Sequence, residues 1–288
     1  MRNDKKIFII SDYFADQISG GGELNDWELI SLLHREGFLI KRVNSQNVNV
    51  SMIDDTIKEG YSFVVSNFAL LGKDCIKALS DRGNYAIYEH DHKYLVKRNP
   101  ALYENYVAPK EKIINLDFYA SAATVFCQTS FHMDIVKKNL NIDNLVNLGG
   151  NLWSTEHLGI LEDMSCMEKE ETYAIVNYPN VEHKNTMAAI RFCQTKKIKY
   201  KLIDPCETEK FLRELGKHQA LVFFPKTPET LSRITLEARM MGMRTITTKN
   251  IGAMYEPWFY KKGLDLIDEM RYAKKEEILK NVVDSLYE

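Results

Sequence analysis

The chain has 288 residues, which is long enough for two medium-sized domains that each bury a core. Apolar residues make up 45% of it and charged residues 27%, proportions typical of a soluble globular protein. The formal net charge of −2 gives no overall reason to expect nucleic acid or an anionic membrane as a partner, because both attract an excess of positive charge.

The first half of the chain alternates apolar runs with amphipathic segments, in the order of a doubly wound α/β domain. Residues 6–10 predict a buried strand, residues 19–22 (Ser-Gly-Gly-Gly) a loop, and residues 23–36 an amphipathic helix. Gly37 is expected to end this helix. Further strands are predicted at 38–43, 63–65, 85–88, 124–127 and 146–148, and helices at 73–82 and 131–139.

The pattern weakens after two glycines at 149 and 150, and then a second alternation begins. Residues 154–171 are polar and acid-rich without a clear strand, which predicts a linker between domains. The second alternation comprises strands at 173–176, 200–203, 221–224 and 245–248, helices at 184–196 and 207–215, and a last amphipathic segment at 274–286.

Residues 221–252 carry the most information about function. The apolar run 221–224 ends at a proline, which suits a strand buried on both faces of a parallel sheet. Thr230 or Ser232 can cap the helix that follows, and Gly242 suits the left-handed residue beyond the helix end. Ligands of open α/β sheets bind at the carboxyl ends of strands, where free helix amides favour phosphate. The turn after this strand is therefore the predicted ligand-binding rim.

Two glutamates, Glu229 and Glu237, lie eight residues apart in this turn and helix, and Ala238 follows the second. With Gly242 at the helix end, this arrangement resembles retaining glycosyltransferases of the GT-B fold (glycosyltransferase group 1, family 4-like). The resemblance implies that Glu229 contacts the donor sugar and that Glu237 holds the nucleotide ribose. The competing interpretation, which we do not prefer, makes Glu229 a partner for the helix dipole and Glu237 a solvated helix-face residue.

The resemblance covers most of the chain and implies two Rossmann-like domains that face a cleft, with the last helix packed back on the N-terminal domain. We place the N-terminal, acceptor-side domain at residues 1–165 together with the C-terminal helix at 272–288. The nucleotide-sugar-binding domain is then 166–271.

Two glycines, Gly21 and Gly22, lie in the predicted loop between the first strand and the first helix. Glycine lets a backbone approach a phosphate or sugar closely, because no Cβ stands in the way. The spacing is neither the Gly-x-Gly-x-x-Gly of dinucleotide folds nor a P-loop. The resemblance implies a glycine-rich loop that faces the donor, whereas the spacing alone equally suits a flexible connector.

The segment Glu-His-Asp-His at 89–92 follows a predicted strand. His90 and His92 could be metal ligands, although the sequence offers no second cluster of ligands, or one of them could be a general acid or base. The resemblance implies a third role, because His90, followed by Asp91, matches a family histidine that meets the donor sugar. A structural histidine is the competing interpretation for His90 and the preferred one for His92.

The start of the predicted second domain matches the family region where a basic pair neutralises the donor diphosphate. Lys184 matches the family lysine, but Asn-Tyr-Pro-Asn at 177–180 replaces the expected arginine. A departing diphosphate gains negative charge, so a missing cation is significant. Arg233, Lys226 or Arg98 could compensate, although a solvated surface role is the preferred interpretation for each.

Small residues usually follow the first family glutamate, and this chain has Thr230, Leu231 and Ser232 there. Their amides, and those of the helix that begins near Arg233, are expected to bind the diphosphate. We therefore expect donor-binding contacts from these four residues.

The sequence thus predicts a glycosyltransferase that moves a sugar from a nucleotide-sugar donor, with a UDP- or GDP-sugar expected, to a glycan, lipid or small-molecule acceptor. Retention of configuration is implied by the resemblance alone. No Asp-x-Asp motif is present, so we expect no metal and no further cofactor. The alternatives are a nucleotide-sugar 2-epimerase of the same fold and a catalytically silent binding partner that has lost the arginine.

The 5 cysteines are odd in number, widely spaced and without a Cys-x-x-Cys pair, so neither disulfides nor a zinc ribbon is expected. Residues 1–6 lack the apolar region of a signal peptide, and no stretch reaches the length of a membrane span. We expect a cytoplasmic protein, for which a peripheral membrane contact remains open.

Overall fold

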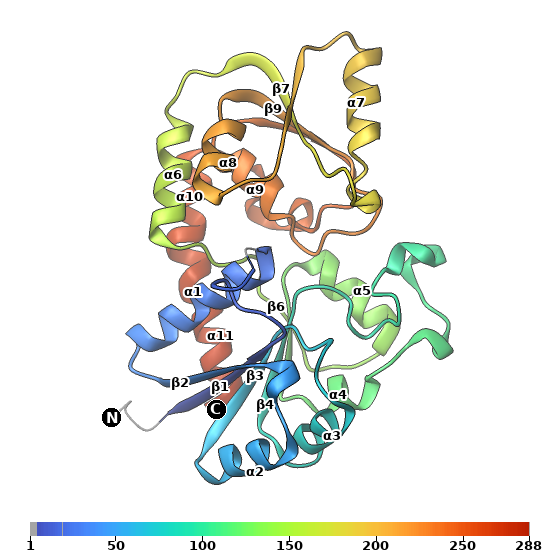
Figure 1. Cartoon of the computed structure of the whole chain (residues 1–288), viewed down its shortest axis with the longest axis vertical. Coiled ribbons are helices and arrows are strands. Elements are labelled where there is room, and N and C mark those ends of the chain that lie inside the picture. Colours follow the sequence, from blue (N-terminus) through green and yellow to red (C-terminus); the bar gives the residue numbers. More distant parts are fainter. Residues whose placement is uncertain (1–4, 19, 288) are drawn as a thin grey trace. The chain divides into compact units, whose positions relative to one another are not determined.

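The computed structural model describes residues 5–18 and 20–287 and divides into two compact units (Figure 1). Unit 1 contains residues 1–152 and 274–288, and unit 2 contains residues 153–273. The chain therefore enters unit 2 once, after Leu152, and returns to unit 1 for its last helix.

Unit 1 is built on a six-stranded parallel sheet in the order β2-β1-β3-β4-β5-β6. Its strands are β1 (Lys6–Ser11), β2 (Leu39–Asn44), β3 (Tyr61–Val65), β4 (Tyr85–Glu89), β5 (Thr124–Cys127) and β6 (Leu145–Asn147). The central strands are apolar runs whose residues are almost all buried, as expected for a parallel sheet covered by helices on both faces.

Helices cover both faces of this sheet. They are α1 (Gly21–Arg35), α2 (Val50–Lys58), α3 (Lys73–Arg82), α4 (Leu116–Ser121), α5 (Ser130–Leu140) and α11 (Lys275–Tyr287). One core packs α2, α3, α4 and α5 against the sheet, and the other packs α1 and α11. Figure 1 shows α11, at the red end of the chain, beside the strands of unit 1. The prediction that the last helix packs back on the N-terminal domain is therefore confirmed.

Unit 2 has a four-stranded parallel sheet in the order β10-β9-β7-β8. Its strands are β7 (Glu170–Val176), β8 (Tyr200–Ile203), β9 (His218–Phe223) and β10 (Arg244–Thr247). Its helices are α6 (Thr155–Ser165), α7 (Thr186–Thr195), α8 (Thr208–Leu215), α9 (Arg233–Met240) and α10 (Leu264–Asp268), followed by a π-helical turn (Glu269–Lys274) that reaches unit 1.

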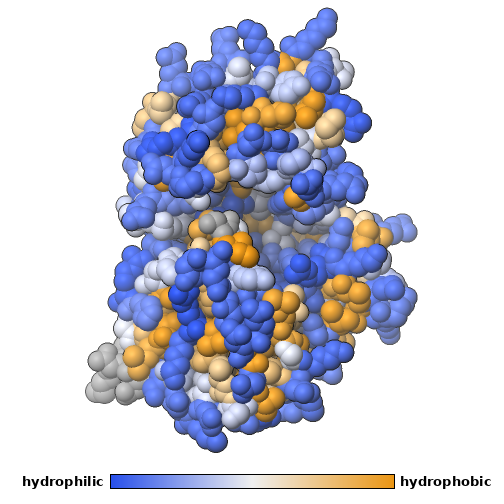
Figure 2. Space-filling view, in the orientation of Figure 1, coloured by the Kyte–Doolittle hydropathy of each residue, from blue (hydrophilic) through white to orange (hydrophobic). Residues whose placement is uncertain are grey.

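Short 3₁₀ turns complete both units, at Ser45–Asn47, Pro100–Leu102, Glu104–Tyr106, Lys110–Lys112, Glu182–Lys184, Gly252–Tyr255 and Pro257–Tyr260. Hydrophilic side chains dominate the face drawn in Figure 2, and apolar ones form separate patches. Within the described part of the chain, no helix has the length and apolar character needed to cross a bilayer.

The predicted linker was wrong, because residues 154–171 contain the whole of α6. Leu158, Leu161 and Met164 are buried in the core of unit 2, and Ser154 Oγ caps the helix by accepting from the His157 amide at 3.1 Å. Acidic residues on the opposite face made the segment polar overall, so its average composition concealed its apolar stripe.

The predicted glycine loop was also wrong, because α1 begins at Gly21 and takes both Gly21 and Gly22 into its first turn. Gly20 occupies the N-cap position, and Ser19 lies outside the described residues. Helices α2, α4 and α10 were not predicted, and they are short, with nine, six and five residues. Short helices depend on tertiary packing more than on their own sequence pattern.

Candidate functional site

An ion pair in unit 2 joins two of the predicted site residues, Lys184 and Glu229. Lys184 Nζ lies 2.9 Å from Glu229 Oε1 and 3.0 Å from Oε2, so the ammonium donates to both carboxylate oxygens. The side chains are 24% and 14% exposed, which leaves the pair accessible to solvent on one side. The fold thus brings together two residues that are far apart in sequence.

The backbone holds Glu229 beyond the carboxyl ends of β9 and β10. Its amide donates to Asn250 O at 2.8 Å and its carbonyl accepts from Gly252 N at 2.9 Å, which forms an isolated parallel bridge to Ile251. Both Glu229 and Ile251 follow their strands by a few residues. This is the rim where ligands bind in open α/β sheets.

Lys184 ends a 3₁₀ turn that precedes α7, and its ammonium has aromatic neighbours. It lies 5.7 Å from the ring centroid of Phe223 and 5.9 Å from that of Tyr178. Burial, with further contributions from the charges of Glu229 and Glu237, raises the pKa of Tyr178 to about 12. Tyr178 is therefore a neutral hydroxyl near both predicted glutamates, and it occupies the stretch where the family arginine was expected.

Glu237 is buried and already bonded within unit 2. Its Oε1 accepts from Trp153 Nε1 at 3.0 Å and lies 3.1 Å from His157 Nε2 and 3.5 Å from Arg233 Nε. Burial opposes ionisation, but the neighbouring His157 ring, together with Arg233 and Trp153, lowers the pKa of Glu237 to about 2. Glu237 is therefore a carboxylate, and all of these contacts fall on one of its two oxygens.

Thr230, Leu231 and Ser232 lead into α9, but no side-chain cap forms there. Ser232 occupies the N-cap position with φ +78°, and its Oγ lies 2.9 Å from Thr235 Oγ1. Leu231 is buried in the apolar core of unit 2. The prediction that Thr230 or Ser232 caps the helix is wrong, because Ser232 stands at the N-cap position without a side-chain hydrogen bond to the helix amides.

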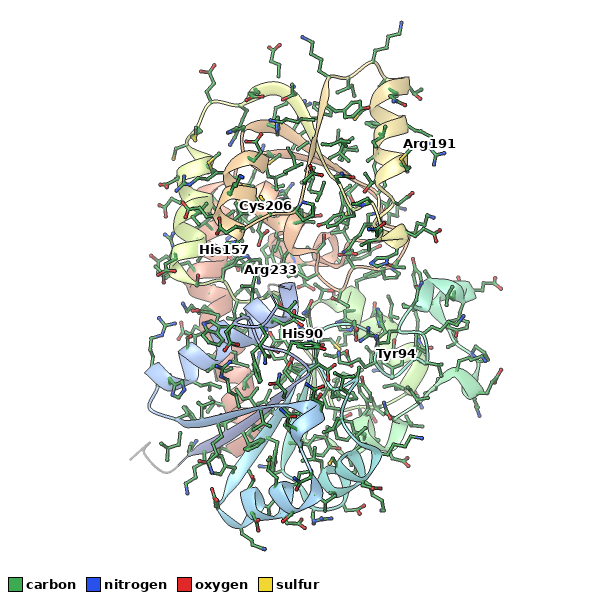
Figure 3. All side chains as sticks on the ribbon, viewed as in Figure 1. His90, Tyr94, His157, Arg191, Cys206 and Arg233 are labelled. Atoms are coloured by element: carbon green, nitrogen blue, oxygen red, sulfur yellow. The ribbon has the colours of Figure 1, made fainter. Side chains whose placement is uncertain are left out.

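The three cations that could compensate for the missing arginine all have acidic neighbours. The Arg233 guanidinium stacks over the Trp153 ring, 4.3 Å from its centroid, and lies beside Glu237. Lys226 pairs with Glu182, with 2.7 Å between Nζ and Oε1. Arg98 belongs to unit 1, where its Nη1 lies 3.4 Å from Asp91 Oδ2. Figure 3 labels Arg233 and His157 in unit 2. Lys184 is thus the predicted cation that the fold places directly at Glu229.

His90 belongs to unit 1, where it follows β4 (Figure 3). Its Nε2 lies 2.8 Å from Asp26 Oδ1, and its Nδ1 lies 2.6 Å from Gln128 Nε2. The ring stacks on Tyr88, with 4.9 Å between centroids and 25° between planes. His90 is therefore held by contacts to both nitrogens and to one ring face.

Gly22 lies against this histidine. A Cβ at position 22 would lie 3.2 Å from His90 Cγ and 3.3 Å from Asn67 Nδ2, which is tighter than an ordinary contact. The close approach that requires a glycine here is therefore to the His90 ring and the Asn67 amide. Gly21 is exposed on the first turn of the same helix.

His92 points into different surroundings from His90. It is buried, its Nδ1 lies 3.0 Å from Tyr94 OH, and burial lowers its pKa to about 4. Across residues 5–18 and 20–287, no three His, Cys, Asp or Glu side chains are grouped so as to hold a metal ion. His92 is thus a neutral histidine of the unit 1 interior.

A buried ionic network lies next to these histidines. Lys93 Nζ is 2.6 Å from Glu89 Oε1 and 2.9 Å from Asp91 Oδ1, and Tyr119 OH also donates to Glu89. His132 joins the segment after β5 to the loop after β4. Its Nδ1 accepts from the Gln128 backbone amide at 3.2 Å, and its Nε2 donates to the Asp91 carbonyl oxygen at 3.0 Å. This network fixes the loop that carries His90.

Sequence reasoning missed Asp26, Gln128 and Trp153 as partners of the predicted site residues. Asp26 had a detectable signal, because it lies one helical turn after Gly22 and so on the same helix face. Gln128 and Trp153 had none, since their contacts to His90 and Glu237 join segments distant in sequence.

Comparison with known proteins gives structural similarity without sequence similarity. No protein-family model matches the chain, and no curated protein matches it by sequence. HepE from Anabaena, solved with UDP and glucose, is similar with a TM-score of 0.55 at 11% identity, over 98% of this chain and 94% of that one.

Two further solved structures agree. Sucrose-phosphate synthase from Thermosynechococcus elongatus has a TM-score of 0.57 at 9% identity, covering 87% of this chain and 82% of its own. The catalytic domain of starch synthase IV from Arabidopsis thaliana, bound to ADP and acarbose, has a TM-score of 0.55 at 8% identity, covering 98% and 94%. The chain therefore has the GT-B glycosyltransferase fold, and the predicted fold class is confirmed.

Proposed function

We propose that the protein is a glycosyltransferase that moves a sugar from a nucleotide-sugar donor to an acceptor. The observation that carries this proposal is the pairing of Lys184 with Glu229 beyond the carboxyl ends of the unit 2 strands. A GT-B fold alone would not assign an activity. A partly exposed cation at this rim can bind the diphosphate of a donor, and the carboxylate beside it can accept hydrogen bonds from the sugar.

In this mechanism, Lys184 binds the diphosphate and stabilises the negative charge that grows on it as the glycosidic bond breaks. Glu229 orients the sugar by accepting hydrogen bonds from its hydroxyl groups. In the absence of donor these two residues neutralise each other, so donor binding replaces one ion pair with another. Amides of Leu231, Ser232 and Arg233 complete the diphosphate contacts.

Glu237 takes the ribose. Trp153, His157 and Arg233 converge on its Oε1, so Oε2 offers the lone pairs that a ribose hydroxyl requires. A carboxylate anchored by one oxygen is preorganised, because no side-chain entropy remains to be lost when a ligand binds to the other. Tyr178 donates its neutral hydroxyl nearby in place of the absent arginine.

The donor is a UDP-, GDP- or ADP-sugar, and the reaction proceeds with retention and without a metal ion. The HepE structure contains UDP and the starch synthase structure ADP, which supports a nucleoside diphosphate as the leaving group. Lys184 supplies the positive charge that a divalent cation supplies in metal-dependent transferases. A glycan, a lipid headgroup or a small molecule is the acceptor.

The proposal is tested first by thermal shift with UDP-, GDP-, ADP- and CMP-sugars, since a ligand that binds the native state raises Tm with concentration. The stabilising donor is then incubated with an acceptor panel, with and without EDTA, and the product anomer is read by NMR. Transfer with retention in EDTA is the expected result. An epimerised donor would instead assign a 2-epimerase, and tight donor binding without turnover would assign a silent binding subunit.

A further inference from the structure

We propose that Asp26 and Gln128 are positioning residues that hold His90 in a single tautomer, with the proton on Nε2 and the lone pair on Nδ1. The effect of this arrangement on activity rests on the proposed function and on the expectation, implied by the resemblance, that His90 meets the donor sugar. The tautomer itself does not, so it can be tested whether or not the protein transfers a sugar.

Asp26 sets the position of the proton. Its side chain is 2% exposed, and its Oδ2 accepts from Ser66 Oγ at 2.5 Å and from Ser11 Oγ at 3.3 Å. A carboxylate oxygen accepts hydrogen bonds, so the 2.8 Å contact between Oδ1 and His90 Nε2 places a ring hydrogen on Nε2. An imidazole with its single hydrogen on Nε2 carries its lone pair on Nδ1.

Gln128 is matched to that lone pair. Its side-chain amide nitrogen is 2.6 Å from His90 Nδ1, which places an N–H donor against the unprotonated nitrogen. Gln128 follows β5 directly, while His90 follows β4, so neighbouring parallel strands deliver both residues to the same edge of the sheet. Each ring nitrogen therefore faces a partner of the opposite hydrogen-bonding character.

The ring cannot exchange its two nitrogens without a rearrangement. Tyr88 stacks on one face, and Gly22 approaches so closely that even a Cβ would lie 3.2 Å from His90 Cγ. Asp26 and Gly22 belong to the same helix, α1, so the helix that supplies the carboxylate also restricts the ring. Orientation of an imidazole by a buried carboxylate is the way in which serine protease triads select a tautomer.

The direct test is ¹⁵N NMR of the full chain with labelled histidine. The chain has 7 histidines, and the His90 signals are assigned by their loss in His90→Gln. We expect a pyridine-type nitrogen at Nδ1 and a protonated nitrogen at Nε2. The double variant Asp26→Asn with Gln128→Glu places an amide donor at Nε2 and a carboxylate acceptor at Nδ1, so it should reverse the pattern. A wild-type proton on Nδ1, or an unchanged pattern in this double variant, overturns the proposal.

Asp16→Asn is the matched control, because Asp16 is a surface acid of unit 1 that pairs with Arg42 at 2.9 Å. It should leave the His90 signals unchanged. If Asp26→Asn does not fold, the wild-type spectrum still decides the tautomer, and Gln128→Ala is used for the activity measurements. A shift of the His90 signals in Asp16→Asn would also contradict the assignment to Asp26.

The second test is a double-variant cycle on donor turnover. Asp26→Asn should lower kcat about tenfold to a hundredfold, the loss seen when a hydrogen-bond partner that orients a metal-bound histidine is removed. In the His90→Gln background the same substitution should have no further effect, because it acts through the ring. Independent, additive losses would make Asp26 a purely structural residue and sink the proposal. Absence of any turnover in the wild type would count against the proposed function only, since the NMR result stands separately.

Discussion

The two units differ in how they hold their charged side chains. In unit 2, Lys184 and Glu229 are 24% and 14% exposed. In unit 1, the side chains of His90 and Asp26 are 7% and 2% exposed, and those of Lys93 and Glu89 are 2% and 0%. A partly exposed ion pair can exchange its partner for a charged ligand at little desolvation cost, whereas a buried pair fixes geometry and resists exchange.

We therefore expect the charged pair of unit 2 to contribute mainly to activity and the buried pairs of unit 1 mainly to stability. Loss of the unit 2 pair should reduce activity and leave stability nearly unchanged. Loss of a buried partner should reduce stability, because it leaves an uncompensated charge in the interior.

The largest expected effect is that of Lys93→Met, which leaves Glu89 buried without its cation. Breaking a buried ion pair from one side costs about 3–5 kcal/mol, so urea unfolding should show a loss of that size. Burial already raises the pKa of Glu89, and removal of Lys93 raises it further. Lys97→Met, a nearby exposed change, is the control and should be neutral.

Adding Glu89→Gln to Lys93→Met should recover much of the lost stability, because the buried charge is then gone. A Lys93→Met protein as stable as the wild type would show that the unit 1 network is solvated, and the contrast between the units would fail.

Glu237→Gln tests whether unit 2 also contains a structural charge. Lowering the pKa from 4.5 to about 2 corresponds to on the order of 3 kcal/mol of stability. For a depressed carboxyl this contribution is complete above about pH 4.5 and is lost as the pH falls toward about 2. The variant should therefore be less stable at neutral pH and should lack this acid-dependent loss, as measured by urea unfolding between pH 2 and pH 7.

Glu171→Gln serves as the control, since Glu171 is an exposed residue of β7. It should follow the wild-type pH profile. Identical acid profiles for Glu237→Gln and the wild type would mean that Glu237 is not the carboxylate responsible.

Glu229→Ala and Lys184→Ala should each reduce transfer or donor hydrolysis by about a hundredfold or more, as expected for lost transition-state contacts. Their stability should change by about 1 kcal/mol or less, because the pair is partly exposed. Steady-state kinetics with the donor found by thermal shift provides the measurement.

Lys226→Ala is the matched control for this pair. Lys226 also forms an ion pair in unit 2, with Glu182, but the two side chains are 49% and 90% exposed. Wild-type rates in Lys226→Ala, together with large losses in Lys184→Ala, would show that turnover depends on the Lys184–Glu229 pair and not on any ion pair of unit 2. Wild-type rates in both Glu229→Ala and Lys184→Ala would remove the proposed mechanism.

The smallest expected effect is that of Gly22→Ala, which forces the His90 ring to move by a few tenths of an ångström. We expect a severalfold loss of turnover and a stability change of about 1 kcal/mol or less. Gly159→Ala is the control, since a Cβ there meets nothing within 4 Å and alanine favours a helix. Equal activities for the two variants would show that the position of His90 is not critical.

Much of the fold could be predicted from the sequence because the relevant signals are local. Every strand of both sheets was expected near its observed place, since apolar runs bounded by turn residues predict buried parallel strands. The predicted helix at 73–82 has the bounds of α3, Lys73–Arg82. Helix α6 was missed because its acidic face outweighed the three buried apolar residues in its composition.

The candidate site likewise contains residues that were predicted from local patterns and partners that were not. Glu229, Glu237, Lys184 and His90 were identified from short patterns next to predicted strands. Their partners were not, because Trp153 and Glu237 are 84 residues apart and Gln128 and His90 are 38 apart. Whether these side chains act as ligand contacts remains a prediction.

The sequence by itself determined the alternation of strands and helices and the residue types at the strand ends, because both depend on neighbours within a few positions. Only the tertiary structure decided which charges meet. It pairs Lys184 with Glu229 where both are partly exposed, and it buries Asp26 together with His90. It also packs Gly22 closely against the His90 ring. Burial, and with it the strength of each charged pair, arises when distant segments pack together.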